Sequence, residues 1–91
     1  MPHDVDVLVG TNIRNRRLYL GKTQDELGKS LGVTFQQIQK YEKGTNRVSA
    51  SRLSDIAKAL ETTIGYFFGE ELQYPERRKN RDRRDGDRRK K

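Results

Sequence analysis

Apolar residues recur along the chain at helical spacing, and short polar stretches separate one group from the next. The clearest group lies in residues 49–60, where four apolar residues occupy positions i, i+3, i+4 and i+7. These residues are Leu53, Ile56, Ala57 and Leu60. Ser49 precedes them and is a typical N-cap, so the pattern predicts a helix that begins just after it.

An earlier amphipathic segment runs from Val5 to Leu20, and Gly21 provides a stop for it. Its apolar residues near one helical face are Val5, Val9, Ile13 and Leu20, with Leu8 beside them. Arg14 and Arg16 lie on the opposite side. We therefore predict a first helix that braces the elements following it.

Residues 23–44 have the pattern of two short helices joined by a glycine turn. Thr23 and Glu26 form a capping box, in which each side chain satisfies a backbone N–H at the helix start, and Thr34 with Gln37 repeats the spacing. The inward apolar residues are Leu27, Leu31, Val33, Ile38 and Tyr41, and the glycines that end the helices are Gly32 and Gly44.

A short fifth helix is predicted from Ile64 to Phe68, ending at Gly69. Two adjacent phenylalanines cannot share one narrow helical stripe, so at least one of them should lie at the edge of the core and be available to another chain. The candidates for a dimer contact are Tyr66, Phe67, Phe68 and Leu72.

These segments predict an all-α, compact five-helix domain in residues 1–69. In residues 70–91 the apolar content falls to Leu72 and Tyr74 before Pro75, so this segment cannot bury enough surface to offset its ordering entropy. We predict a disordered, charged tail. Three roles for it stay open: a solvating tail, a nonspecific nucleic-acid arm, or a docking segment for a protein partner.

Composition argues against a catalytic or metal site. The 91 residues include no cysteine and only one histidine, His3, which has no companion ligand at a suitable spacing. No carboxylates cluster on a common face, so no acid/base constellation is available. We expect a protein that is not an enzyme and needs no metal or cofactor.

The charge of the chain favours a polyanionic partner. The formal net charge is +7, of which residues 1–69 supply +3, with ten Lys/Arg against seven Asp/Glu. Residues 70–91 supply +4, with ten against six. No apolar run approaches the roughly 20 residues of a membrane span, and no signal core follows the N-terminus. A soluble, cytoplasmic protein is expected.

The second helix of the central motif, residues 34–43, has the outward chemistry of a helix that enters the DNA major groove. Gln36 and Lys40 lie one turn apart on one face, where an amide can bind adenine and an ammonium can bind guanine. Phe35 can meet a thymine methyl group. A solvated helix face is the alternative for the same residues, but the flanking motif favours base reading.

Helix N-termini carry unpaired N–H groups and partial positive charge, so Gln24 and Thr34 are placed to bind phosphates. The residues that we expect at the DNA backbone are Thr34, Gln37, Lys43, Asn46, Arg47 and Arg14. Such contacts position a protein on DNA without selecting a sequence. Simple solvation is an equal alternative for Arg14.

Residues 8–68 resemble the XRE-type, lambda-repressor-like helix-turn-helix family, which includes phage repressors and Cro proteins. The matching residues are Arg17, Leu20, Gly21, Thr23, Gln24, Leu27, Gly32, Val33, Ile38, Glu42, Gly44, Ser49, Leu53, Ile56, Ala57 and Leu60. The resemblance implies a five-helix domain that binds a two-fold symmetric operator as a dimer. It also implies base or adjacent phosphate contacts from Gln24, Phe35, Gln36 and Lys40, and a structural ion pair between Arg17 and Glu42.

Two residues depart from the family pattern. Gly28 stands where alanine is usual, which would permit closer packing but costs about 0.5–1 kcal/mol of helix stability. Phe35 is larger and less polar than most residues at the first reading position, and it either reads a thymine methyl or folds back as a hydrophobic cover.

The sequence therefore predicts a transcription regulator, with repression favoured, that binds double-stranded DNA as a homodimer and associates with the bacterial nucleoid. An antitoxin or adaptor that binds a protein partner through residues 70–91 is one alternative. A nucleic-acid-binding protein with little sequence preference is the other.

Overall fold

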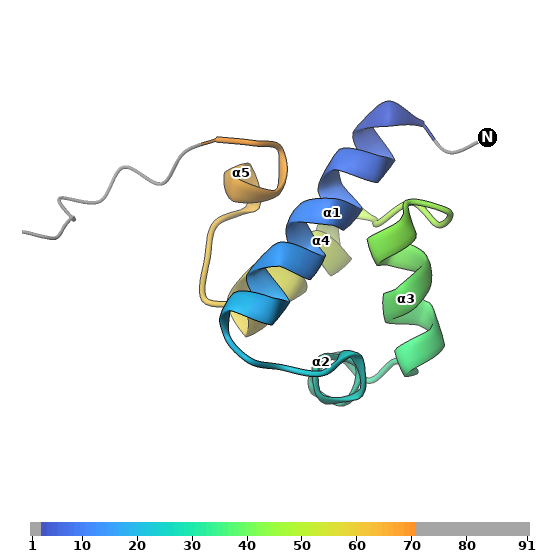
Figure 1. Ribbon diagram of the computed structural model, residues 1–91, viewed down its shortest axis with the longest axis vertical. Helices are drawn as coiled ribbons and strands as arrows, with labels where there is room; N and C mark the ends of the chain where they lie inside the picture. The colour runs from blue at the N-terminus through green and yellow to red at the C-terminus, as the bar shows by residue number, and fades with distance from the viewer. Residues whose placement is uncertain (1–2, 71–91) are drawn as a thin grey trace, which may run out of the picture.

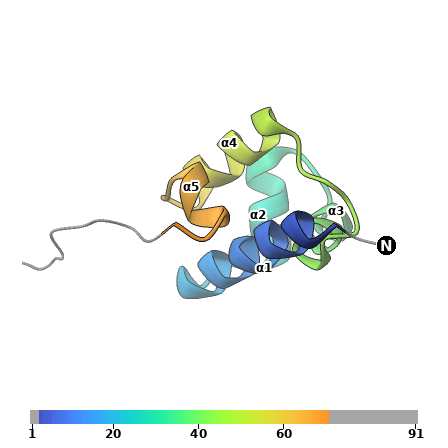
Figure 2. The same ribbon diagram turned by 90° about the horizontal axis from the view of Figure 1, so that it is seen from above.

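The computed structural model describes residues 3–70, and within them the chain forms five helices and no strand (Figure 1). The helices are α1 (Asp4–Tyr19), α2 (Gln24–Leu31), α3 (Phe35–Lys43), α4 (Ala50–Ala59) and α5 (Ile64–Phe67). The predicted all-α, five-helix class is confirmed. The predicted tail, apart from its first residue, lies outside the described residues. Figures 1 and 2 place α3 at the opposite side of the domain from α5.

Local capping chemistry fixes where the helices begin. The capping box of α2 is complete, because Thr23 Oγ1 accepts from the Glu26 N–H at 3.0 Å and the Thr23 N–H donates to Glu26 Oε1 at 2.8 Å. At α3 only half of the pattern forms, with Thr34 Oγ1 accepting from the Gln37 N–H at 3.2 Å. Each cap satisfies a donor that the first turn of a helix leaves without an intrahelical partner.

The core draws on all five helices. The buried apolar residues are Val9, Ile13, Leu27, Ile38, Tyr41, Leu53, Ile56, Ala57, Leu60 and Phe67. Two residues near the predicted inner face of α1, Val5 and Leu8, are instead exposed, and Val5 lines an open groove. The buried residues of α1 are Val9, Gly10, Ile13 and Arg17, of which Val9 and Ile13 are the apolar side chains of its inward face.

The two adjacent phenylalanines have different environments. Phe67 is fully buried in the core, so its prediction as a dimer contact is wrong, whereas the Phe68 side chain is 46% exposed. Thr63 caps α5 through the Tyr66 N–H, and this start turns Phe67 toward the interior. The Asn12 amide on α1 donates to the Phe67 carbonyl oxygen at 3.1 Å and fixes α5 against α1.

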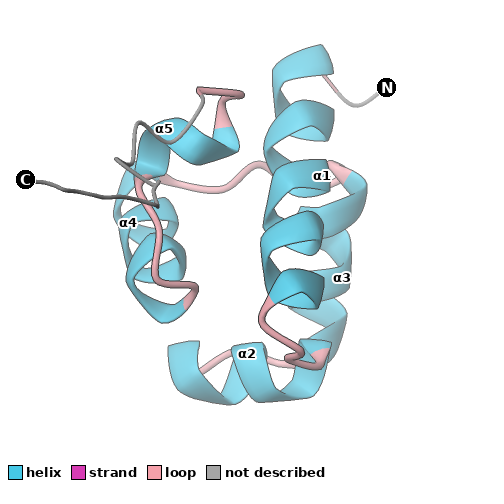
Figure 3. Ribbon diagram, turned by 60° about the vertical axis from the view of Figure 1, so that its left-hand side comes forward, coloured by secondary structure: helices cyan, strands magenta, loops and turns pink. Residues whose placement is uncertain are grey.

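Glycines permit a close approach between α1 and α3, which Figure 3 shows packed together. A Cβ at Gly10 would overlap the Tyr41 carbonyl oxygen and lie 2.7 Å from that of Glu42. Gly28 plays the same role between α2 and the following turn, since a Cβ there would lie 2.6 Å from the Val33 carbonyl oxygen. The lower helix propensity of Gly28 therefore accompanies the closer packing that the sequence suggested.

Candidate nucleic-acid interface

The outward face of α3 carries a row of polar and cationic side chains. Gln36, Lys40 and Lys43 are exposed, while Ile38 and Tyr41 pack inward on the same nine-residue helix. Gln36 and Lys40 are four residues apart and thus share a face. This arrangement separates the residues that hold α3 in the domain from those that it exposes to solvent.

Phe35, the first residue of α3, is 45% exposed and does not belong to the core or to the apolar residues packed against it. The alternative in which it folds back as a hydrophobic cover is therefore wrong. As the first residue after the Thr34 cap, Phe35 lies at the N-terminal end of the helix. Gln37, in the same turn, is half-buried.

A buried ion pair connects α1 to the base of α3. Arg17 Nε donates to Glu42 Oε2 at 2.6 Å and Arg17 Nη2 donates to Glu42 Oε1 at 3.0 Å, with side-chain exposures of 8% and 3%. Arg17 Nη1 also donates to the Lys22 carbonyl oxygen at 2.7 Å. Such two-point contacts fix direction as well as distance, so α3 is held in one rotation about its own axis.

Gln24 belongs to the same network. Its side-chain amide donates to Glu42 Oε1 at 3.1 Å, and the residue is half-buried. This contact joins α2 to α3 and commits one amide hydrogen to the protein interior. A base or phosphate contact from Gln24 must therefore use the rest of the carboxamide.

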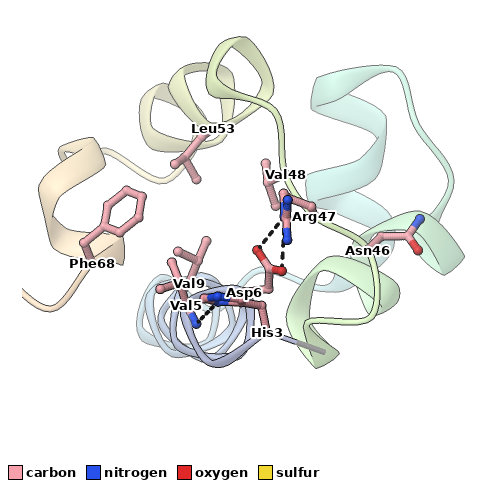
Figure 4. Close-up of a pocket in the computed structure, with 9 residues that line it drawn as sticks. All are labelled: His3, Val5, Asp6, Val9, Asn46, Arg47, Val48, Leu53 and Phe68. Carbon is pink, nitrogen blue, oxygen red and sulfur yellow. Dashed lines mark hydrogen bonds and ion pairs between the residues drawn. The ribbon is translucent and has the colours of Figure 1, made fainter. Parts of the chain in front are cut away.

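Arg47, in the loop after α3, contacts a carboxylate on α1. Asn46 and Arg47 are both exposed, and Arg47 Nε donates to Oδ1 and Oδ2 of Asp6, each at 3.3 Å (Figure 4). Both loop residues and Asp6 border a groove of about 370 Å³, whose apolar lining includes Val48 and Phe68.

Of the two arginines predicted on the outer side of α1, only Arg14 is exposed; the prediction is wrong for Arg16, which is half-buried against the end of α4. Arg14 is exposed, so it stays a candidate for a phosphate contact. Arg16 instead donates to the carbonyl oxygens of Leu60 and Glu61, each at 2.8 Å, and its guanidinium lies 5.1 Å from the Tyr19 ring centroid. Arg16 therefore satisfies carbonyl oxygens at the C-terminal end of α4, and its guanidinium has a structural role.

Two contacts at this site were not found from the sequence. The Asp6–Arg47 pair joins residues 41 positions apart, and the Gln24–Glu42 bond joins two helices, so neither leaves a periodic or capping pattern.

Within residues 3–70 no group of three or more His, Asp or Glu side chains could hold a metal ion. No helix among those residues is both long enough and apolar enough to cross a membrane.

Comparison with known sequences matches residues 13–67 to the helix-turn-helix family. A transcriptional regulator of helix-turn-helix type from Sinorhizobium medicae is 58% identical over 67 residues, covering 74% of this chain and 48% of the relative. A transcriptional regulator in the ATPase CF(0) region of Rhodospirillum rubrum is 57% identical over 68 residues, covering 75% and 63%. The chain thus spans about half the length of the curated relatives it matches.

Solved structures give the same fold. The P22 c2 repressor, crystallised with a synthetic operator, superposes with a TM-score of 0.64 at 30% identity, covering 69% of this chain and 96% of the repressor. The restriction-modification controller protein C.AhdI from Aeromonas hydrophila superposes with a TM-score of 0.65 at 26% identity, covering 68% and 94%. With the family match extending over more than half of its length, the chain belongs to the XRE-type, lambda-repressor-like helix-turn-helix family.

Proposed function

We propose that this chain is a sequence-specific transcription regulator, most simply a repressor, that inserts α3 into the DNA major groove. The observation that carries the proposal is the exposed row of Gln36, Lys40 and Lys43, with the exposed Phe35 at its start, on a helix whose opposite face is fixed by the Arg17–Glu42 pair. The operator complex of the P22 c2 repressor and the regulator names of the relatives support it.

The outward residues divide into two roles. Gln36 and Lys40 read adenine and guanine edges, Phe35 meets a thymine methyl, and Gln24 contributes an adjacent contact. The residues assigned to the DNA backbone are Thr34, Gln37, Lys43, Asn46, Arg47 and Arg14. The Thr34 hydroxyl already accepts from the Gln37 N–H, so a phosphate at this position would bind the remaining N–H groups at the start of α3.

A homodimer fits this function, because a two-fold symmetric operator with half-sites about 34 Å apart needs two reading helices. Phe68 and the half-buried Tyr66, in and directly after α5, are the proposed contacts, while Leu72 lies outside the described residues. Cytoplasmic location and association with the nucleoid follow from DNA binding. Analytical ultracentrifugation of Phe68→Ala should show weaker self-association than the wild type; unchanged association would contradict this contact.

Selection from random duplexes tests the DNA-reading function. A repeated or palindromic motif should emerge, and its absence would contradict sequence-specific binding. Lys40→Ala should change the base preferred at one position of each half-site, whereas Arg47→Ala should weaken all duplexes to a similar degree. Lys58→Ala, which removes an exposed cation from the last turn of α4, is the matched control and should change neither property.

Removal of residues 77–91 separates this function from its alternatives. A sequence-reading domain should keep its base preference after the deletion and lose part of its affinity, because the ten cations in residues 70–91 supply only nonspecific attraction. Complete loss of binding would favour a weakly specific nucleic-acid-binding protein. Co-purification of a stoichiometric protein that requires residues 70–91 would favour an adaptor or antitoxin.

A further inference from the structure

Asp6 contacts the cation that the proposed function assigns to the DNA backbone. Asp6 lies in the first turn of α1 and its side chain is 16% exposed, whereas the Arg47 side chain lies on the loop after α3 and is 75% exposed. The two side chains meet across the edge of the groove drawn in Figure 4. A flexible, solvated arginine is therefore tied to a carboxylate on a rigid helix.

The geometry of this contact leaves the far end of the guanidinium available. Both hydrogen bonds to Asp6 start from Arg47 Nε, at 3.3 Å to each carboxylate oxygen. A guanidinium has four more N–H groups on its two terminal nitrogens, and that fork matches a pair of phosphate oxygens. Asp6 and a phosphate can thus bind opposite ends of the same side chain at the same time.

We propose that Asp6 is a positioning residue that holds Arg47 ready for a DNA backbone phosphate. An unrestrained arginine loses much rotamer freedom when it binds a phosphate, and the contact with Asp6 removes part of that freedom before DNA arrives. The inference rests on the proposed DNA binding, and it adds to the interface a residue that does not touch DNA.

Loss of the Asp6 charge would also remove a repulsion toward DNA, and this effect must be separated from positioning. Asp4 offers the matched control, because it lies in the same first turn of α1 and is exposed. Asp6→Asn and Asp4→Asn change the net charge equally. Only the first of them alters the contact with Arg47.

The test is a thermodynamic cycle of duplex affinities, measured by fluorescence anisotropy on the selected operator and on an unrelated duplex. Asp6→Asn should bind both duplexes about two- to fivefold more weakly than Asp4→Asn, the range expected for an exposed ion pair. In an Arg47→Ala background the two asparagine variants should bind equally. Backbone contacts carry no sequence information, so the ratio should be the same on both duplexes.

Two results would overturn the positioning role. If Asp6→Asn binds as tightly as Asp4→Asn, the contact does not position Arg47, and if it binds more tightly, Asp6 holds Arg47 away from DNA. If the difference persists in the Arg47→Ala background, Asp6 acts through α1 and not through Arg47. A wild-type chain that selects no motif would contradict sequence reading, but the ratio on the unrelated duplex would still test the role of Asp6.

Discussion

Replacing only one partner of the Arg17–Glu42 pair should destabilise the domain more than replacing both partners with apolar residues. The Glu42 carboxylate accepts three hydrogen bonds, two from Arg17 and one from Gln24, in a site where both charged side chains are less than one-tenth exposed. In Glu42→Gln the guanidinium stays buried without a counter-charge. Breaking a buried pair in this way costs about 3–5 kcal/mol.

That cost is a large share of the roughly 5–15 kcal/mol by which a domain is stable. In a domain of this size each 1 kcal/mol shifts the melting temperature by about 4–8 °C, so Glu42→Gln should melt at least about 12 °C below the wild type. Arg17→Met should be similarly destabilised, because it leaves the Glu42 carboxylate buried without a positive partner. The double variant Arg17→Met/Glu42→Met should come within about 1 kcal/mol of the wild type, since neither charge is then buried.

Urea unfolding, followed by circular dichroism at the helical band, measures the free energy of unfolding of the wild type, the two single variants and the double variant. The exposed pair of Lys29 and Asp25 on α2, 3.2 Å apart, provides the control, and its removal should change the free energy of unfolding by less than about 0.5 kcal/mol. A double variant less stable than either single variant would refute the reasoning, because it would show that each residue stabilises the fold independently of the other.

Two further predictions concern a helix cap and a helix crossing. The Thr23 backbone N–H, and then its hydroxyl, hold the pKa of Glu26 below its ordinary value, so this carboxylate stabilises the fold above a pH of about 4.3 and the benefit is lost as pH falls through the lowered pKa. Glu26→Gln should therefore flatten the acid side of a stability profile measured by thermal unfolding, and an unchanged slope would contradict the role of the cap. Gly10→Ala should lower stability by about 1–3 kcal/mol in urea unfolding, because its Cβ meets backbone of Tyr41. Gly65→Ala is the control, since a Cβ there would meet only the flexible end of a side chain, and equal losses from the two variants would refute the argument.

Features set by local chemistry could be predicted from the sequence. The starts of α2, α3 and α4 depend on the hydroxyls of Thr23, Thr34 and Ser49, which bond to N–H groups three residues away. The ends of α2 and α3 depend on Gly32 and Gly44, whose φ angles of 74° and 78° suit a residue without a side chain. Both kinds of signal act within one helical turn, so a single sequence contains them.

Features set by the packing of distant segments could not be predicted in the same way. Helical spacing placed Val5 and Leu8 near the inward side of α1, but which residues are covered depends on where α4 and α5 end. Likewise the sequence could state that Phe67 and Phe68 cannot both be central, and only the docking of a single helical turn decides which one is. Gly10 left no signal, because its function is to let the backbone of α3 approach.

The reading helix owes its geometry to these distant contacts. α3 has nine residues, and an isolated helix of that length is not stable in water, so its position on DNA must be imposed by α1 and α2. Gly10 sets how near α3 lies to α1, and the Arg17–Glu42 pair sets its rotation. Under the proposed function, a shift of either would carry Lys40 away from its base edge, where a hydrogen bond tolerates a few tenths of an ångström. The proposed base preference would therefore depend on these buried residues as much as on the side chains proposed to touch the bases.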